Sequence, residues 1–367
     1  MNHDSYALLV KCARLVGDRP FYTHLQTDLA NFTAWDSLIT QAEAQSMAPL
    51  LYHHLQRTEV PLPPEFRLQL QGLILRHRQA NAIRLDVLSH ILDILAEAGI
   101  PVLVLKGGAL ATLVYPQIGL RPMSDLDLLV TDTAAQEAQN LLWQAGFRPN
   151  PAAQHIPPDH RHLPVLMVQQ DGLTVSVEIH RQLLGGLLVQ AKNPSALVWD
   201  APLSFSLNGR PAYTLSPIHM LWHLCHHTLT EPVRLIRLVD IMAVAEKYTQ
   251  EIDWTAVRQT YPEIIAFLSN LHFVTPLSEN LRAKAGIILK QKPAGTELAL
   301  ADWPPLPRIH WAGKTYRQIL QATFLPSEFS LRFFYGIPNH HSHLWHRWLH
   351  HPLQILWWWL ARRLPNL

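Results

Sequence analysis

Two acidic residues interrupt an otherwise apolar stretch, Ser124–Val130, in which Asp125 and Asp127 alternate with leucines. This alternation predicts a β-strand, because side chains two positions apart project from the same face. The two carboxylates then share a face, with Cα atoms roughly 7 Å apart. Carboxylates that emerge from a buried apolar strand are costly unless a cation or hydrogen bonds stabilise them. The pattern therefore favours a cation site, although an isolated pair with this spacing is also typical of a strand end or a solvated face.

A third acidic residue follows on a later predicted strand. Leu163–Gln169 and Leu173–Ile179 are predicted to form a hairpin around Asp171-Gly172. Glu178 lies near the end of the second strand and would stand beside the acidic pair if the strands are adjacent, with His180 pointing to the same face. Three such carboxylates can hold hard cations, and two Mg²⁺ ions roughly 3.5–4 Å apart can clamp the attacking and leaving oxygens of a phosphoryl displacement.

A glycine pair lies upstream of the acids. Val102–Leu105 is a short apolar run that predicts a strand, and it ends in Lys106-Gly107-Gly108 before a predicted helix at Ala109–Tyr115. Glycines at a turn from strand to helix often serve only steric needs. At the start of a helix, however, free N–H groups and the helix dipole can hold a triphosphate, and Lys106 would add a positive charge.

The remaining pattern divides the chain into four regions. Residues 1–80 are predicted to be helical with a break at Pro61, Pro63 and Pro64, and residues 81–190 hold the predicted strands. Residues 191–265 are predicted to form a helical region that completes the cleft, with helices opening at Ser216-Pro217 and spanning Val233–Lys247. Residues 266–367 form a helical region rich in Trp and His. We therefore predict an α/β (α+β) fold, with a small mixed sheet flanked by N-terminal and C-terminal helical regions.

Charge, cysteine content and the length of apolar runs indicate which partners and which compartment to expect. Lys and Arg total 30 and Asp and Glu total 28, so the formal net charge of +2 does not indicate a binder of long nucleic acids. Cys12 and Cys225 lie far apart and suit a reducing compartment. The N-terminus lacks the pattern of a signal peptide, and apolar runs such as Ile355–Leu360 are shorter than the roughly 20 residues that cross a bilayer. We expect a cytoplasmic protein without a transmembrane segment.

Two polar clusters lie beyond the predicted sheet. His223, His226 and His227 share a predicted helix, and the step of three residues places the first two on one face. Packing or substrate contact is favoured over a metal site, because no acid or cysteine is nearby in sequence. Asp240 is expected to pair with Arg234 or Arg237, or to face the nucleotide cleft.

The C-terminal segment from His340 to Leu367 combines histidines, tryptophans and arginines. The simplest interpretation is a helix that packs its tryptophans onto the protein, and contact with a partner, nucleic acid or a membrane surface is the alternative. The residues concerned are six histidines up to His351, Trp345, Trp348, Trp357, Trp358, Trp359, Arg347, Arg362 and Arg363.

Several of these motifs together resemble a known family. The segments that carry the resemblance are Val104–Leu110, Tyr115, Arg121–Val130, Gly146-Phe147, Val177–His180, Leu215–Pro217 and Leu238–Ile241, together with the three helical histidines. Across roughly residues 85–260 the chain resembles the bacterial uncharacterised nucleotidyltransferase family of the polymerase-β-like nucleotidyltransferase superfamily. One departure is the spacer of sixteen residues between Gly108 and Asp125, which exceeds the minimal pattern of the superfamily but fits this branch.

The resemblance implies roles for particular residues. Asp125 and Asp127 would be the first two metal ligands and Glu178 the third carboxylate, all three being catalytic. Nucleotide contacts would come from Lys106, Gly107, Gly108, Arg121, Ser124 and His180.

The implied reaction is metal-dependent transfer of a nucleoside monophosphate from an NTP to an acceptor hydroxyl. ATP is the default nucleotide, and two Mg²⁺ ions are expected, with Mn²⁺ as an alternative. The acceptor is left open among a small molecule, a peptide or protein side chain, and an RNA end. Two other functions stay open: a nucleotide-binding or regulatory protein without catalysis, and a kinase-like phosphotransferase.

Overall fold

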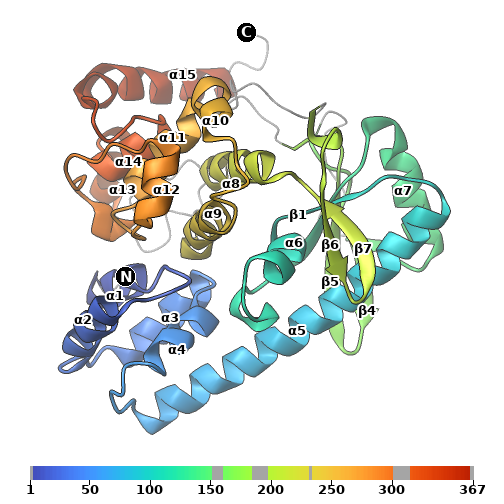
Figure 1. The fold of residues 1–367 in the computed structure, drawn as a ribbon, viewed down its shortest axis with the longest axis horizontal. Helices are drawn as coiled ribbons and strands as arrows, with labels where there is room; N and C mark the ends of the chain where they lie inside the picture. The colour runs from blue at the N-terminus through green and yellow to red at the C-terminus, as the bar shows by residue number, and fades with distance from the viewer. Residues whose placement is uncertain (1–2, 151–159, 184–196, 231–233, 301–314, 364–367) are drawn as a thin grey trace.

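The computed structural model describes residues 3–150, 160–183, 197–230, 234–300 and 315–363, and its elements are labelled in Figure 1. The helices are α1 (His3–Lys11), α2 (Arg19–Leu29), α3 (Trp35–Ala44), α4 (Ala48–Leu55), α5 (Pro64–Glu97), α6 (Lys106–Leu113), α7 (Asp132–Gln144), α8 (Pro217–Thr230), α9 (Leu235–Lys247), α10 (Trp254–Thr260), α11 (Pro262–Leu271), α12 (Glu279–Ala285), α13 (Tyr316–Phe324), α14 (Glu328–Phe334) and α15 (His351–Arg363). The strands are β1 (Leu103–Leu105), β2 (Asp125–Leu129), β3 (Arg148–Pro149), β4 (Leu166–Gln170), β5 (Leu173–His180), β6 (Leu203–Leu207) and β7 (Arg210–Thr214).

Five strands form one mixed sheet in the order β1-β2-β5-β4-β3. Strand β2 runs parallel to β5, while the other neighbouring pairs are antiparallel. The four strands predicted from the sequence correspond to β1, β2, β4 and β5. The predicted α/β fold with a small mixed sheet among helices is therefore confirmed.

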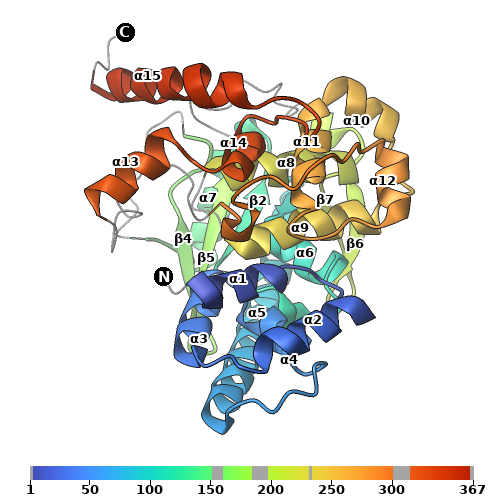
Figure 2. The ribbon, with the colours of Figure 1, turned by 90° about the vertical axis from the view of Figure 1, so that its left-hand side faces the viewer.

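The two faces of the sheet belong to two different hydrophobic cores. On one face, Leu126 and Leu128 of β2 pack with Leu88 and Ile91 of α5 and with Leu142 of α7. On the other face, Leu105 and Leu129 join a larger core that also contains side chains from the N-terminal helices and from α8, α9, α11 and α14. Figure 2 shows the N-terminal helices gathered below α8 and α9. The two acids of β2 alternate with Leu126 and Leu128, so they project towards this larger helical half.

The longest helix, α5, joins the two halves of the molecule. Its 34 residues span about 50 Å at 1.5 Å per residue. It begins at Pro64, directly after the predicted proline break, and ends two residues before Gly99, whose φ of 70° suits a glycine after a helix. The helix runs without interruption through residue 80, so the predicted boundary between regions 1–80 and 81–190 lies inside it.

The prediction of an all-helical region over residues 191–265 is wrong, because β6 and β7 form a two-stranded hairpin there. The turn residues Asn208 and Gly209 both have positive φ, of 49° and 81°. Asn-Gly at such a turn is the sequence typical of a tight hairpin, and Phe205 and Leu207 turn buried side chains to the core of the sheet.

The tryptophans of the C-terminal segment are mostly exposed. The exposed fractions are 62% for Trp345, 66% for Trp348 and 50% for Trp357, whereas Trp358 is 8% exposed. The interpretation that this segment packs its tryptophans onto the protein is therefore wrong for three of them, and the side chain of Trp359 lies outside the described residues. Contact of this surface with a partner or a membrane surface stays a prediction. In the part of the chain that the structure describes, no helix has the length and hydropathy to span a membrane.

The packing of α6 against β1 and α5 gives a testable prediction. A Cβ added to Gly108 would lie 2.9 Å from Val104 Cγ1 and 3.3 Å from Leu88 Cδ2, which is closer than packed carbon atoms allow. We expect Gly108→Ala to lower the free energy of unfolding by about 1 kcal/mol or more, measured by urea denaturation. The matched control is Gly72→Ala, because Gly72 lies in the exposed part of α5 with nothing within 4 Å of its added Cβ. This control should be stabilised by about 0.5–1 kcal/mol, and equal effects of both substitutions would contradict the packing argument.

Candidate active site

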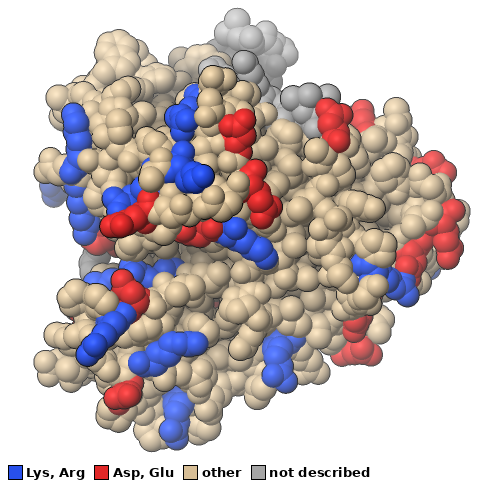
Figure 3. Space-filling model, viewed as in Figure 1, with Lys and Arg blue, Asp and Glu red and all other residues tan. Residues whose placement is uncertain are grey.

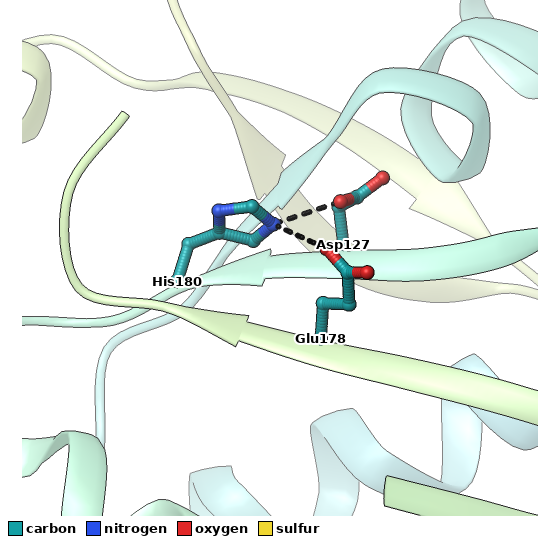
Figure 4. A group of neighbouring side chains, drawn as sticks. All are labelled: Asp127, Glu178 and His180. Atoms are coloured by element: carbon teal, nitrogen blue, oxygen red, sulfur yellow. Dashed lines mark hydrogen bonds and ion pairs between the residues drawn. The ribbon is translucent and has the colours of Figure 1, made fainter. Parts of the chain in front are cut away.

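The three predicted acids lie on one face of two adjacent strands. Because β2 and β5 are parallel, Asp127 stands opposite Glu178 in the register and Asp125 stands opposite Ser176. Residues opposite each other on neighbouring strands project from the same face, and so do residues two positions apart. The structure therefore brings Asp125, Asp127 and Glu178 to the same face of the sheet, and His180 joins them there. Figure 4 shows the side chain of His180 beside those of Asp127 and Glu178.

Asp127 is the most enclosed of the three acids, and two nitrogen donors hold its carboxylate. Its side chain is 3% exposed, and Oδ1 lies 2.8 Å from both Lys106 Nζ and His180 Nε2. Burial alone would raise the pKa of Asp127, but the Lys106 ammonium and the contact with His180 hold it well below its usual value. The carboxylate is therefore ionised at neutral pH, as a metal ligand must be.

Asp125 is half-buried, whereas Asp127 is almost completely buried. It accepts a hydrogen bond of 2.9 Å from Ser124 Oγ. Burial and the neighbouring charge of Asp127 raise its pKa above the usual value, against the opposing effect of Lys106. Two neighbouring carboxylates repel one another when both are ionised, and a cation bound between them would relieve that repulsion.

Glu178 is flanked by two imidazoles. Its Oε2 lies 3.4 Å from His180 Nε2 and 3.8 Å from His162 Nε2. Burial opposes ionisation of Glu178, but the contact with His180 holds its pKa below the usual value. The pKa of His162 is lowered because burial disfavours the imidazolium, so this ring is neutral at pH 7.

One group of donor atoms fits a metal ion among the described residues. Single ligand atoms of Asp127, Glu178 and His180 all lie within 4.8 Å of one another. Carboxylate oxygens and an imidazole nitrogen are suitable ligands for divalent cations. Asp125 is not a member of this group, although it lies on the same face.

The Lys106-Gly107-Gly108 segment is not a loop, because α6 begins at Lys106 itself. The residue with left-handed backbone is Lys106, with φ of 45°, whereas neither glycine has a positive φ. The glycines instead allow close packing: a Cβ on Gly107 would lie 2.6 Å from Arg121 Nη1. Gly107 and Gly108 therefore leave room for neighbouring side chains and do not turn the backbone.

Arg121 is held by a buried acid from the helical half of the molecule. Its Nη2 donates to Asp240 Oδ2 over 2.7 Å and its Nε to Oδ1 over 3.2 Å, while the Tyr115 hydroxyl donates to Oδ1 over 2.7 Å. Burial alone would lower the pKa of Arg121, but Asp240 raises it, so the guanidinium stays charged. We expected Asp240 to pair with Arg234 or Arg237, or to face the cleft. Its carboxylate is instead held by Arg121 and Tyr115, and it lines the pocket, as the second alternative had it.

A pocket of about 330 Å³ opens in front of these residues. One wall carries the acids, and the opposite walls come from α8, α9 and the N-terminal helices. The lining residues are Ser46, His77, Lys106, Gly107, Arg121, Pro122, Met123, Ser124, Asp125, Asp127, Glu178, Leu224, His227, Thr228, Arg234, Ile236, Arg237 and Asp240. Of the predicted nucleotide contacts, Gly108 and His180 do not line this pocket.

A known protein family matches most of the chain. The profile of a family described as uncharacterised nucleotidyltransferase matches residues 32–274. The chain belongs to this family. The expected family is thus confirmed, and the match extends beyond the expected residues 85–260 into the N-terminal helices. Helices α3 and α4 lie inside the matched segment, whereas α1 and α2 precede it.

No curated protein matches the chain. A solved structure of an antigenic nucleotidyltransferase-like protein from Paracoccidioides brasiliensis is similar with 15% identity and a TM-score of 0.37, covering 57% of this chain and 95% of that one. This similarity is too low to bear on function.

The histidines of α8 separate instead of forming one cluster. His226 lies 3.4 Å from Glu263, while His223 packs against His227 one helical turn further along. The two residues thus have different partners, and the favoured interpretation of packing over a metal site is confirmed for His223. His223 is 1% exposed, and burial holds its pKa well below the usual value, so it is a neutral residue of the core.

Sequence reasoning missed several residues of this family member's pocket. His77 and Ser46 line the pocket, and His162 lies beside Glu178 without lining it; all three come from segments in which no local motif points to chemistry. Only the parallel pairing of β2 with β5 and the docking of the N-terminal helices bring them to the acids. A prediction of strand order would have been needed to find His162.

The buried pair of Arg121 and Asp240 gives a second prediction. Replacing Asp240 by Asn leaves the Arg121 guanidinium buried without a counter-charge, so we expect a loss of about 3–5 kcal/mol in the free energy of unfolding. Urea denaturation monitored by circular dichroism measures it. The matched control is Asp28→Asn, which removes an exposed pair with Lys11 and should cost at most about 1 kcal/mol. Similar losses in both variants would show that the buried pair has no special role.

Proposed function

We propose that this family member is a metal-dependent nucleotidyltransferase that transfers a nucleoside monophosphate from an NTP to an acceptor hydroxyl. The observation that carries the proposal is the register of β2 and β5, which sets Asp127 beside Glu178, with Asp125 two residues away, at the wall of a pocket. Family membership supports the same chemistry.

In the proposed reaction, the acceptor oxygen forms a bond to the α-phosphorus of the NTP. The bond from this phosphorus to the bridging oxygen breaks, and pyrophosphate leaves with that oxygen. Asp125, Asp127 and Glu178 would hold two divalent ions, with Mg²⁺ expected from the oxygen donors. When bound, such ions neutralise charge on the phosphates and align the reacting oxygens. Glu178, ionised at neutral pH, is available to accept the proton of the acceptor hydroxyl.

The surrounding residues have supporting roles in this proposal. Lys106 stands at the start of α6, where its ammonium and the free N–H groups of the first turn favour the phosphates. Ser124 orients Asp125, and His180 orients Asp127. Arg121 fixes the segment before β2 through its pair with Asp240.

The substrate is the least defined part of the proposal. A pocket of about 330 Å³ is at the lower end of the range for small-ligand sites, which suits part of a nucleotide such as ATP. The acceptor is proposed to be a small molecule, a peptide or protein side chain, or an RNA end. The near-neutral net charge of +2 favours the smaller acceptors, and Figure 3 shows basic and acidic side chains interspersed on one face of the molecule.

Two rival functions predict different products. A regulatory protein that binds nucleotides without catalysis would form no product, and a kinase-like enzyme would release nucleoside diphosphate. The proposed enzyme releases pyrophosphate.

The deciding experiment uses α-³²P-labelled NTPs, Mg²⁺ and a cell extract as the source of acceptors. We expect the wild-type chain to label an acceptor and to release pyrophosphate, and we expect EDTA to stop both. Asp127→Asn keeps the size of the side chain but removes a charged ligand, so labelling should fall roughly a thousandfold or more.

The matched control for this variant is Asp171→Asn. Asp171 lies in the exposed turn of the same sheet with φ of 48°, a conformation that asparagine tolerates. Labelling by this variant should equal that of the wild type. Labelling that survives in folded Asp127→Asn, or that is absent from the wild type with every NTP, would end the enzymatic proposal.

A further inference from the structure

The last helix, α15, presents large apolar side chains to the outside of the molecule. It continues directly from the π-helical turn His346–His350, and Figures 1 and 2 both show it at the outer edge of the C-terminal half. Five large apolar residues recur at steps of four, four, three and four residues, which places them on one face of the helix. This outward face is made by side chains that are 43% to 62% exposed: Trp345, Leu349, Leu353, Leu356 and Leu360. A surface helix ordinarily turns polar residues outward, so α15 has the reverse arrangement.

The opposite face of α15 fixes the helix to the protein. His351 and Trp358 are buried there. His351 Nε2 donates to the carbonyl oxygen of Thr323 over 2.8 Å, so Nδ1 accepts from the Tyr335 hydroxyl, also over 2.8 Å. The ring of Trp358 packs edge-on against Phe334, with centroids 5.7 Å apart. A rotation of α15 that hid its outward face would break these contacts, so the apolar side chains stay exposed in this fold.

The positive charge of the chain is concentrated at the same end. From Phe329 to Leu367 the sequence contains four arginines, six histidines and no acidic residue. The rest of the chain has 26 basic and 28 acidic side chains, and hence a formal net charge of −2. Arg332 is paired with Glu328, which leaves the three arginines that flank or end the helix. The outward face therefore belongs to a basic segment of an otherwise slightly acidic protein.

The residue types of this segment match the chemistry of a lipid surface. Five of the twelve tryptophans of the chain lie between residues 345 and 359. Tryptophan favours the boundary between headgroups and acyl chains, leucine favours the acyl chains, and arginine is attracted to anionic headgroups. A second copy of the chain suits this face less well, because pairing would bring two basic segments without acids together.

We propose that the outward face of α15 binds the surface of a bilayer that contains anionic lipids. The helix lies in the membrane plane, because its 13 residues are fewer than the roughly 20 that cross a bilayer. Its leucines enter the boundary of the acyl chains, and the exposed tryptophans lie at the level of the headgroups. This inference does not rest on the proposed function, because binding to lipid requires neither an NTP nor a metal.

The test measures sedimentation of the full-length chain with lipid vesicles. We expect binding to vesicles of phosphatidylcholine with about one third phosphatidylglycerol, and binding at least about tenfold weaker to phosphatidylcholine alone. Because surface charges are screened by salt, binding to the anionic vesicles should also weaken as the NaCl concentration rises.

A pair of matched variants tests the outward face itself. The double variant Leu353→Gln, Leu356→Gln removes two apolar side chains from it, so affinity for the anionic vesicles should fall about tenfold or more. The control is Leu68→Gln, Leu75→Gln on α5, where the leucines are 63% and 59% exposed, and it should bind as the wild type does. All four leucines are exposed, so urea denaturation should show that both variants stay folded.

Each other outcome contradicts the proposal. Wild type that does not sediment with vesicles, or that binds both kinds of vesicle equally, overturns it. Unchanged binding by folded Leu353→Gln, Leu356→Gln also overturns it. A wild-type dimer that this variant converts to a monomer, without vesicle binding, would assign the face to a second copy instead. Vesicle binding by a chain that transfers no nucleotide supports this inference and contradicts only the proposed enzyme.

Discussion

Asp127 is an almost completely buried carboxylate, and its contacts with Lys106 and His180 make that burial possible. An isolated charge at this position would be strongly destabilising, so both nitrogen donors have to be in place. Lys106 reaches Asp127 from the junction of β1 with α6, and His180 reaches it from the end of β5. These contacts require β2 to lie between β1 and β5, which is the observed strand order. The chemistry of one side chain and the topology of the sheet are thus mutually dependent.

The pair of Arg121 and Asp240 plays a comparable part between the two halves of the molecule. It joins the segment before β2 to α9, and the hydroxyl of Tyr115 completes the network. Gly107 has no side chain at the place where the Arg121 guanidinium passes α6. The pocket therefore has one wall from the sheet and another from the helices, held together by a buried ion pair rather than by apolar packing alone.

Local patterns were enough to predict four of the five strands of the sheet, the shared face of Asp125 and Asp127, and the family. In a strand, alternating residues must lie on opposite faces, so the alternation of acids with leucines assigns both acids to one face. The β6–β7 hairpin was missed although Asn208-Gly209 has a recognisable turn sequence. Long-range features could not be predicted in this way. The partner of Asp240 and the position of His162 beside Glu178 depend on how distant segments dock, and no local periodicity encodes that docking.

Helix α5 mechanically couples both sides of the pocket. Near its middle, Asn81 donates to the carbonyl oxygens of Ile118 and Arg121 over 2.6 Å and 2.8 Å, and one turn earlier His77 lines the pocket and contacts Glu43 of α3. Its far end lies under the sheet through Leu88. A helix of this length behaves as a rod, so a tilt at its N-terminal end would carry the segment before β2 along with it. A movement of the N-terminal helices would therefore change the width of the pocket through α5, without direct contact with the acids.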